Sequence, residues 1–303
     1  MSIASPTPGV PRQSRLTGNS GHRRRKLVNQ FMMGLSTFAA VLAIAALLLV
    51  IVDVVIKAAP AISWDFLTKL PSTSFLNPSG GGIANSIVGS AILIGLASLI
   101  AIPIGILVAI YTTEFASARI SSAIRFALDI LNGVPTIVIG IFVYGILVVG
   151  HTQSGWAGAI ALSIVELPIV ARSAQEVLAL VPLSLKEAGL ALGLRRWRIV
   201  LRVVLPTATG GLITGAVLGV ARVAGETAPL LFTTSVFSNL TTTTNPSQAL
   251  ANIPTTIFTL SESPTPSDHA KAWAAALVLI AFVLVVSIVA RTLNERSRRK
   301  LGG

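Results

Sequence analysis

The sequence predicts an all-α, polytopic membrane protein with six transmembrane helices. Hydrophobic residues make up 53% of the 303 positions and charged residues only 11%, and the mean hydropathy is +0.81. A soluble domain, in contrast, carries about 25% charged residues. Several uncharged stretches are close to or longer than the roughly 20 apolar residues that a helix needs to cross a bilayer. The absence of cysteine from the sequence excludes disulfides and thiolate metal sites.

The N-terminal part predicts a tail and then the first two spans. Residues 1–26 are rich in Pro, Ser, Gly and Arg and lack an apolar period, so we expect a disordered basic tail. The uncharged stretch Phe31–Val52 is too long for the core of a signal peptide and predicts the first span. A cleaved signal peptide is the alternative. Ile83–Thr113 follows a glycine-rich turn and predicts the second span.

The remaining apolar stretches predict four further spans. The uncharged tract Ile130–Val165 is interrupted by the polar run His151–Gly155, which indicates a hairpin of two spans. Pro206–Thr233 predicts the fifth span and Trp273–Ala290 the sixth. The segment 234–269 between them is rich in Ser, Thr, Asn and Pro and is longer than a simple connection requires. It is expected to be a lid, a docking surface or a re-entrant segment.

The Lys and Arg residues predict the orientation of these spans. Most of the 23 lie in the first tail, between spans two and three, between spans four and five, and after the last span. Because cytoplasmic segments of membrane proteins are enriched in Lys and Arg, we expect these four segments, and therefore both termini, on the cytoplasmic side. This distribution explains the formal charge of +12 by membrane topology, so no nucleic-acid partner is expected.

Several kinds of chemistry are missing from the sequence. None of the lysines is followed by Ser or Thr, so the chain has no Walker A motif and is not expected to hydrolyse ATP. The three histidines are scattered, and no HExxH pattern occurs. We therefore expect a protein that is not an enzyme and that holds neither a metal nor a cofactor of its own.

The basic stretch Glu187–Pro206 predicts an amphipathic helix on the cytoplasmic side. At about 100° per residue, one face carries arginines and the opposite face carries apolar residues. The arginines are Arg195, Arg198 and Arg202, and the apolar residues are Trp197, Val200, Leu201 and Val204. A shorter segment, Leu183–Leu192, precedes this helix, and Gly193 separates the two. From these residues alone, a helix lying on anionic membrane lipid is one interpretation.

The order of residues in the same stretch resembles the EAA loop of ABC-importer permeases. In that loop an acidic residue, small residues, a glycine and a Leu-Pro pair follow one another at fixed spacing. The residues that carry the likeness are Glu187, Ala188, Gly189, Gly193, Leu205 and Pro206. The sequence departs from the pattern at Gly189, where Ala is usual, and at Val203, where Ile is favoured. The resemblance implies that this loop couples the chain to a cytoplasmic ATPase, which would carry the ATP and Mg.

A narrower resemblance covers residues 78–290. The stretches Gly80–Gly89, Asn132–Gly140 and Ala221–Thr233 are similar to those of PstA-type permeases of phosphate-specific ABC importers. The resemblance implies a type I permease fold in a bacterial or archaeal inner membrane, with a permease domain over 27–295 and a short tail over 296–303. The implied partners are a sister permease in a heterodimer, an ATP-binding subunit dimer and an extracytoplasmic phosphate-binding protein.

Other functions stay open at this point. A permease for sulfate, molybdate or another oxyanion is the nearest alternative, because arginine does not by itself distinguish one tetrahedral anion from another. A channel or secondary transporter that acts alone, and a membrane protein that signals phosphate status, are alternatives of other classes.

Charged residues inside the predicted spans are candidates for the substrate pathway. Glycines recur every four residues at Gly211, Gly215 and Gly219, which predicts a smooth helix face for close packing. Arg222 and Glu226 continue on roughly that side. Ionisable groups at membrane depth are costly and usually functional, and Arg presents a fork of donors that suits phosphate oxygens. A purely structural ion pair is the alternative. Secondary candidates near predicted span ends are Asp129, Glu166 and Arg172.

Overall fold

A computed structural model of the chain describes residues 19–72, 81–234 and 242–301. These residues are almost all helical, and between them they form only one isolated β-bridge, between Pro71 and Gly81. The longer helices are α1 (Asn19–Ala58), α3 (Ala84–Ile110), α4 (Ala118–Gly133), α6 (Gly155–Ala179), α9 (Leu205–Ala224) and α12 (Pro266–Leu301). The shorter ones are α2 (Trp64–Thr68), α5 (Thr136–Val143), α7 (Leu183–Ala191), α8 (Arg196–Ile199), α10 (Ala228–Thr233) and α11 (Ile253–Ser261). Three π-helical turns accompany them: η1 (Tyr111–Phe115), η2 (Tyr144–Val148) and η3 (Val200–Val204). The predicted all-α class is confirmed.

The chain divides into two compact units, one ending at Asp53 and one beginning at Val54. The first unit contains most of α1, whose apolar part includes the predicted first span. The tail prediction is wrong for residues 19–26, which are already helical. After Gly21 this stretch holds no helix breaker, and its Arg and Lys residues favour a helix. Residues 1–18 of the predicted tail lie outside the described residues.

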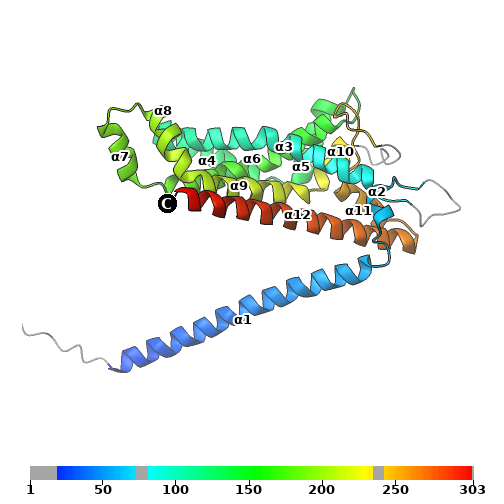
Figure 1. Cartoon of the computed structure of the whole chain (residues 1–303), viewed down its shortest axis with the longest axis horizontal. Coiled ribbons are helices and arrows are strands. Elements are labelled where there is room, and N and C mark those ends of the chain that lie inside the picture. Colours follow the sequence, from blue (N-terminus) through cyan, green and yellow to red (C-terminus); the bar gives the residue numbers. More distant parts are fainter. Residues whose placement is uncertain (1–18, 73–80, 235–241, 302–303) are drawn as a thin grey trace, which may run out of the picture. The chain divides into compact units, whose positions relative to one another are not determined.

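In the second unit, α3, α6, α9 and α12 lie side by side (Figure 1). α6 packs between α3 and α9, and α12 packs on the other side of α9. The helices α7 and α8 lie at one end of this bundle, whereas α2, α10 and α11 lie at the opposite end (Figure 1). α6 therefore has neighbours on both sides, and most of its residues between Gly155 and Leu178 are buried.

The glycine face of α9 allows α9 to approach α6 closely. A Cβ atom added to Gly211 would come within 2.5 Å of Val177, and one added to Gly215 within 2.4 Å of Ser173. At Gly219 the added atom would lie 2.8 Å from the Val170 side chain. Small residues at such a spacing let two helices come together in a membrane. The predicted glycine face is thus confirmed, and its partner is α6.

Among the described residues, five helices are long and apolar enough to cross a membrane. A sixth span arises if α4 is counted with α5 and η2, although these two parts are bent by 95°. The bend lies in the first arm of the predicted hairpin Ile130–Val165, between the end of α4 at Gly133 and the start of α5 at Thr136. Pro135 lacks an N–H donor and disfavours a helical conformation at the residue before it, so the helix ends there. The second arm, α6, continues past Val165 to Ala179.

The fifth span differs from its predicted bounds at both ends. It runs from Arg196 to Ala224 as a continuous helix through α8, η3 and α9, so the predicted separate amphipathic helix is its first part. The π-helical turn η3 ends just before Pro206, where the backbone N–H of Leu205 bonds to the carbonyl of Val200. This widened turn accommodates the missing donor of the proline. Of the predicted apolar face, Val200 and Val204 are buried, whereas Trp197 and Leu201 are exposed.

Part of the predicted outer loop is packed into the bundle. Leu250 is fully buried, and the backbone N–H of Ile253 donates to the hydroxyl of Ser90 on α3 at 2.8 Å. The Asn252 side chain accepts from the N–H of Thr255 at 3.0 Å and begins α11. This part of the segment therefore belongs to the core of the second unit.

The loop also approaches α3 closely at Gly89, where a Cβ atom would lie 1.9 Å from the backbone oxygen of Ala251. The substitution Gly89→Ala should therefore destabilise the protein by about 1–3 kcal/mol, as overpacking does. Thermal unfolding in detergent measures the change. Gly95→Ala is the matched control, because nothing lies within 4 Å of a Cβ atom there, and it should be neutral or stabilising by up to about 1 kcal/mol. Equal unfolding temperatures for the two variants would contradict the packing at Gly89.

Candidate functional site

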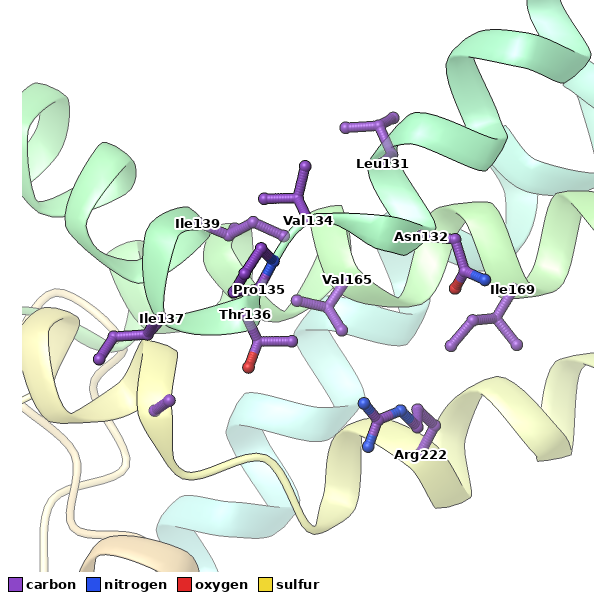
Figure 2. Close-up of a pocket in the computed structure, with 11 residues that line it drawn as sticks. Leu131, Asn132, Val134, Pro135, Thr136, Ile137, Ile139, Val165, Ile169 and Arg222 are labelled. Atoms are coloured by element: carbon purple, nitrogen blue, oxygen red, sulfur yellow. The ribbon is translucent and has the colours of Figure 1, made fainter.

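A pocket of about 390 Å³ lies where α4 breaks into α5, against α6 and α9. Its lining residues are Leu131, Asn132, Val134, Pro135, Thr136, Ile137, Ile139, Val165, Ile169, Arg222 and Ala228. Figure 2 shows Asn132, Thr136 and Arg222 extending into the space between these helices, with Val165 and Ile169 of α6 behind them. The pocket thus combines an apolar wall with one cationic group, one amide and one hydroxyl.

The break between α4 and α5 gives the pocket its polar backbone. The N–H of Val134 bonds to the carbonyl of Ile130 at 3.1 Å, and the next helix begins with a bond from Val138 to Pro135 at 2.9 Å. Irregular backbone at membrane depth is tolerated where it is buried in protein or lines a water-filled cavity. The break places such irregular backbone at the wall of the pocket.

Two of the sequence stretches that carry the family likeness meet beside this pocket. α5 packs against α10, and a Cβ atom at Gly140 would lie 2.6 Å from the Cα atom of Pro229. The stretches Asn132–Gly140 and Ala221–Thr233 are therefore neighbours in space. The described part of the third stretch, 81–89, lies at the start of α3 against the loop before α11.

Arg222 and Glu226 form the predicted ion pair, although Glu226 lies just beyond the end of α9. Nη1 of Arg222 is 2.9 Å from Oε1 of Glu226, and their side chains are 58% and 8% exposed. The approach is not aligned as a hydrogen bond, and within the described part of the chain this buried oxygen has no hydrogen-bond donor. The pair is therefore held by charge, and the guanidinium keeps its directed donors for another acceptor.

Arg172, the third predicted pathway residue, does not line this pocket. Its Nε donates to Oδ1 of Asp129 on α4 at 2.9 Å, and its Nη2 contacts the same oxygen. Its Nη1 also donates to Oε1 of Gln175 at 3.4 Å. The structure thus brings together two of the three predicted residues and places Arg172 in a separate polar cluster.

Glu166 was expected near a span end, in contact with the interface, and this prediction is wrong. Its side chain is completely buried near the middle of α6, because that helix continues well beyond the predicted end at Val165. The Ser98 hydroxyl of α3 lies 3.0 and 3.1 Å from its two carboxylate oxygens. Gly219 of α9 leaves room for this side chain, since a Cβ atom there would lie 3.1 Å from Glu166 Cγ. The burial of Glu166 follows from these contacts with α3 and α9, which the sequence pattern of α6 alone does not show.

The predicted EAA loop forms α7 and the turn that follows it. Glu187 and Ala188 are exposed, whereas Gly189 is buried. A Cβ atom at Gly189 would lie 3.0 Å from the Ile199 side chain. Glycine where the family favours alanine therefore permits tight packing of α7 on α8.

Gly193 closes α7 in a left-handed conformation with a φ of +75°. Its N–H bonds to the carbonyl of Leu190 at 2.9 Å, and the N–H of Leu194 bonds to the carbonyl of Gly189 at 3.1 Å. This pair of bonds is a Schellman motif, which commonly ends helices at a glycine. Gly193 therefore fixes the direction in which the chain leaves α7 and enters α8.

The chain matches a family model described as binding-protein-dependent transport system inner membrane component, over residues 101–299. It is 39% identical over 277 residues to the phosphate transport system permease protein PstA of Pasteurella multocida, covering 90% of this chain and 96% of that protein. It is 40% identical over 262 residues to the probable phosphate transport system permease protein PstA of Methanocaldococcus jannaschii, covering 86% and 90%.

A solved structure shows the same fold. It is a bacterial alginate ABC transporter in complex with an alginate pentasaccharide-bound periplasmic protein, and the matched chain gives a TM-score of 0.61 at 15% identity. The alignment covers 90% of this chain and 96% of that one. The predicted importer-permease fold is thereby confirmed.

Arg222 should make the pocket attract anions. Because the native chain has no cysteine, Thr136→Cys places a single thiol in the pocket. In membrane vesicles, an anionic methanethiosulfonate should modify this thiol faster than a cationic one, and adding Arg222→Gln should lower the ratio of the two rates about tenfold. A thiol at the exposed turn residue His151 is the control and should show no dependence on Arg222. An unchanged ratio at position 136 would place the guanidinium outside the pocket.

Proposed function

The chain belongs to the PstA family of binding-protein-dependent transport system inner membrane components, and we propose that it is the membrane-spanning permease of an ATP-driven importer of inorganic phosphate. It is a transport subunit and not an enzyme. The names of the two relatives support phosphate as the substrate. In this proposal the chain supplies one side of the translocation path, and a separate subunit hydrolyses ATP.

The observation that carries this proposal is the guanidinium of Arg222 at the pocket. The Arg222 side chain is 58% exposed although it belongs to an apolar helix. Asn132 and Thr136 line the same pocket and add an amide and a hydroxyl, which are donors for oxyanion oxygens. Arg binds phosphate oxygens through two parallel hydrogen bonds. A passing phosphate can therefore replace Glu226 as the partner of Arg222.

After a phosphate has left the pocket, Glu226 would pair with Arg222 again and so restore the site without bound anion. A guanidinium without a partner at membrane depth is costly, so a carboxylate that accompanies it stabilises the pocket between transport events. The contact observed here is close but poorly aligned as a hydrogen bond. An incoming anion with better aligned oxygens can displace such a partner, and Glu226 can take its place again after release.

The arrangement of the helices supports the proposed partners. α7 presents the exposed residues Glu187 and Ala188 at one end of the bundle, where a cytoplasmic ATPase dimer would dock with its own ATP and Mg. Near the pocket, exposed apolar side chains such as Phe126 and Phe142 offer a face for a sister permease in a heterodimer. An extracytoplasmic phosphate-binding protein would then meet the end that carries α2, α10 and α11. Both termini are proposed to be cytoplasmic.

A permease for another oxyanion, such as sulfate or molybdate, is the alternative. The guanidinium of Arg222 provides the same donors to every tetrahedral oxyanion, so the names of the relatives, rather than the chemistry of the pocket, favour phosphate. Uptake of labelled phosphate and labelled sulfate by cells with and without this chain separates the two possibilities. If cells without this chain lose sulfate uptake but keep phosphate uptake, the substrate is sulfate and not phosphate.

Removing the charge of Arg222 should abolish efficient phosphate uptake. A hydrogen bond to a charged group contributes about 2 kcal/mol, so Arg222→Gln should reduce uptake about 30-fold while assembly with the partner subunits is retained. Arg222→Lys keeps the charge but loses the planar fork, and it should also impair uptake. The measurement is initial uptake of labelled phosphate, normalised to the amount of assembled complex.

The double variant Arg222→Gln with Glu226→Gln distinguishes a pathway role from a structural one. The pathway proposal predicts that it assembles normally and still fails to transport phosphate. If the double variant restores uptake that both single variants have lost, the pair serves only to pack the helices, and Arg222 is not a substrate contact.

Breaking the turn after α7 should uncouple ATP hydrolysis from transport. Gly193→Pro is incompatible with a φ of +75° and removes the bond from Gly193 to Leu190. Glu187→Lys should likewise weaken docking by reversing an exposed charge. In the assembled complex, both variants should lose the stimulation of ATP hydrolysis by phosphate-loaded binding protein while membrane insertion remains normal.

The matched control for this turn is Gly150, which has a φ of +79° and, like Gly193, nothing within 4 Å of an added Cβ atom. Gly150→Ala and Gly193→Ala impose a similar backbone cost of about 1–2 kcal/mol. Only Gly193→Ala should lower the stimulated hydrolysis, because Gly150 lies in a turn far along the chain from α7. Equal effects of the two variants would remove the coupling role from Gly193.

A further inference from the structure

One ion pair connects α7 with the end of α3. Nζ of Lys186 lies 2.6 Å from Oε1 of Glu114 in η1, and the two side chains are only 21% and 12% exposed. Beside the pair lies a pocket of about 260 Å³, lined by residues of η1, α7, α8 and η3. Exposed ion pairs contribute little, whereas a pair withdrawn from water is costly to break. Removing either Lys186 or Glu114 would therefore leave the other charge largely buried and unpaired at the contact between α7 and η1.

The rest of α7 is attached mainly to α8 and η3, which follow it in the sequence. Gly189 packs on Ile199, and the Schellman turn at Gly193 leads directly into α8. The described contacts of α7 with other helices concentrate on α8 and η3. Lys186 therefore provides a separate connection, because Glu114 belongs to the α3 side of the bundle.

Glu114 lies in a π-helical turn that joins three helices. In η1, the Thr112 hydroxyl accepts from Nε2 of Gln175 on α6 at 2.8 Å. The backbone carbonyl of Thr112 accepts from the hydroxyl of Ser121 on α4 at 3.0 Å. Thr112, Ser121 and Gln175 are all buried. Single π-helical turns are frequent at functional sites, and this one connects α3, α4 and α6 through buried hydrogen bonds.

Polar contacts continue from this turn toward the Arg222 pocket. Gln175 accepts from Arg172, and Arg172 donates to Asp129 on α4. Asp129 precedes Asn132 by one helical turn, and Asn132 lines the pocket. Side-chain contacts, joined by the backbone of η1 and of α4, thus run from Lys186 on α7 to the end of α4 where the pocket begins.

We infer that Lys186 and Glu114 are positioning residues that transmit a displacement of α7, through η1 and α4, to the Arg222 pocket. This inference rests on the proposed function, because it assigns the displacement of α7 to the ATPase cycle. It also gives Arg172 a role as part of the connection between α6 and α4, in place of direct contact with the substrate. The test of this inference measures the coupling between α7 and the pocket directly.

The experiment uses the full complex with its ATPase in proteoliposomes and a single thiol from Thr136→Cys. In the complex with native Lys186 and Glu114, binding of ATP should change the rate at which this thiol is modified. Lys186→Gln and Glu114→Gln should each reduce that ATP-dependent change at least fivefold. Complex assembly and ATP hydrolysis without substrate should stay within about twofold of the native values. These readouts do not require that phosphate be the transported anion.

A charge reversal provides the rescue. Lys186→Glu combined with Glu114→Lys should recover at least half of the ATP-dependent change, whereas each reversal alone should lose it. In the double variant of Lys186→Gln with Glu114→Gln, the loss should be about that of either single variant, because the two residues act together. The control is Lys69→Gln on α2, which breaks an exposed pair with Asp65 at 2.5 Å and should have no effect.

Two results would overturn the inference. One is that the single variants keep the full ATP-dependent change at position 136. The other is that they lower the unfolding temperature and the basal hydrolysis together while the ATP-dependent change per assembled complex stays constant, which is the behaviour of a purely structural contact. If the Thr136→Cys complex with native Lys186 and Glu114 shows the thiol response while the unsubstituted complex takes up no phosphate, the proposed substrate is contradicted and the coupling role stays supported.

Discussion

The close approach of α6 and α9 is the constraint on which the site depends. Lipid chains are as apolar as leucine, so helices in a membrane associate through fitted surfaces rather than through the hydrophobic effect. Gly211, Gly215 and Gly219 provide such a surface, into which Val170, Ser173 and Val177 fit. A bulkier residue at these positions would separate the helices, and the wall formed by Val165 and Ile169 would move away from Arg222.

Helix breaks near this contact supply the polarity that a path for an anion requires. α4 ends at Gly133 before Pro135, and α9 ends at Ala224 before Gly225. Both ends leave irregular backbone near the pocket, while the neighbouring helices remain continuous. The pocket therefore combines a rigid apolar wall from α6 with polar side chains at the end of α4, the start of α5 and the end of α9. Among the described residues that line it, Arg222 is the only charged one.

The sequence predicted much of the fold and only part of the site. Local patterns were sufficient for the apolar spans, for the glycine face of α9 and for the pairing of Arg222 with Glu226, because these depend on residues at most a few turns apart. The burial of Glu166 and the pair between Lys186 and Glu114 could not be predicted in this way, because each depends on which distant helix lies opposite. Span ends failed for a related reason, since polar residues such as Arg172 extend a helix when another helix provides partners.

The contacts of the second unit fall into two kinds that suit two mechanical tasks. α6 and α9 are held by interlocking shapes over about two helical turns, and such packing resists small displacements. α7 packs on α8 and η3 and is held to η1 by an ion pair, and α6 is held to α4 and η1 by hydrogen bonds of Arg172 and Gln175. Polar side chains can exchange partners without opening a cavity. Movement that begins at α7 would therefore rearrange the polar contacts first, leave the α6–α9 contact intact and change the pocket from its α4 side.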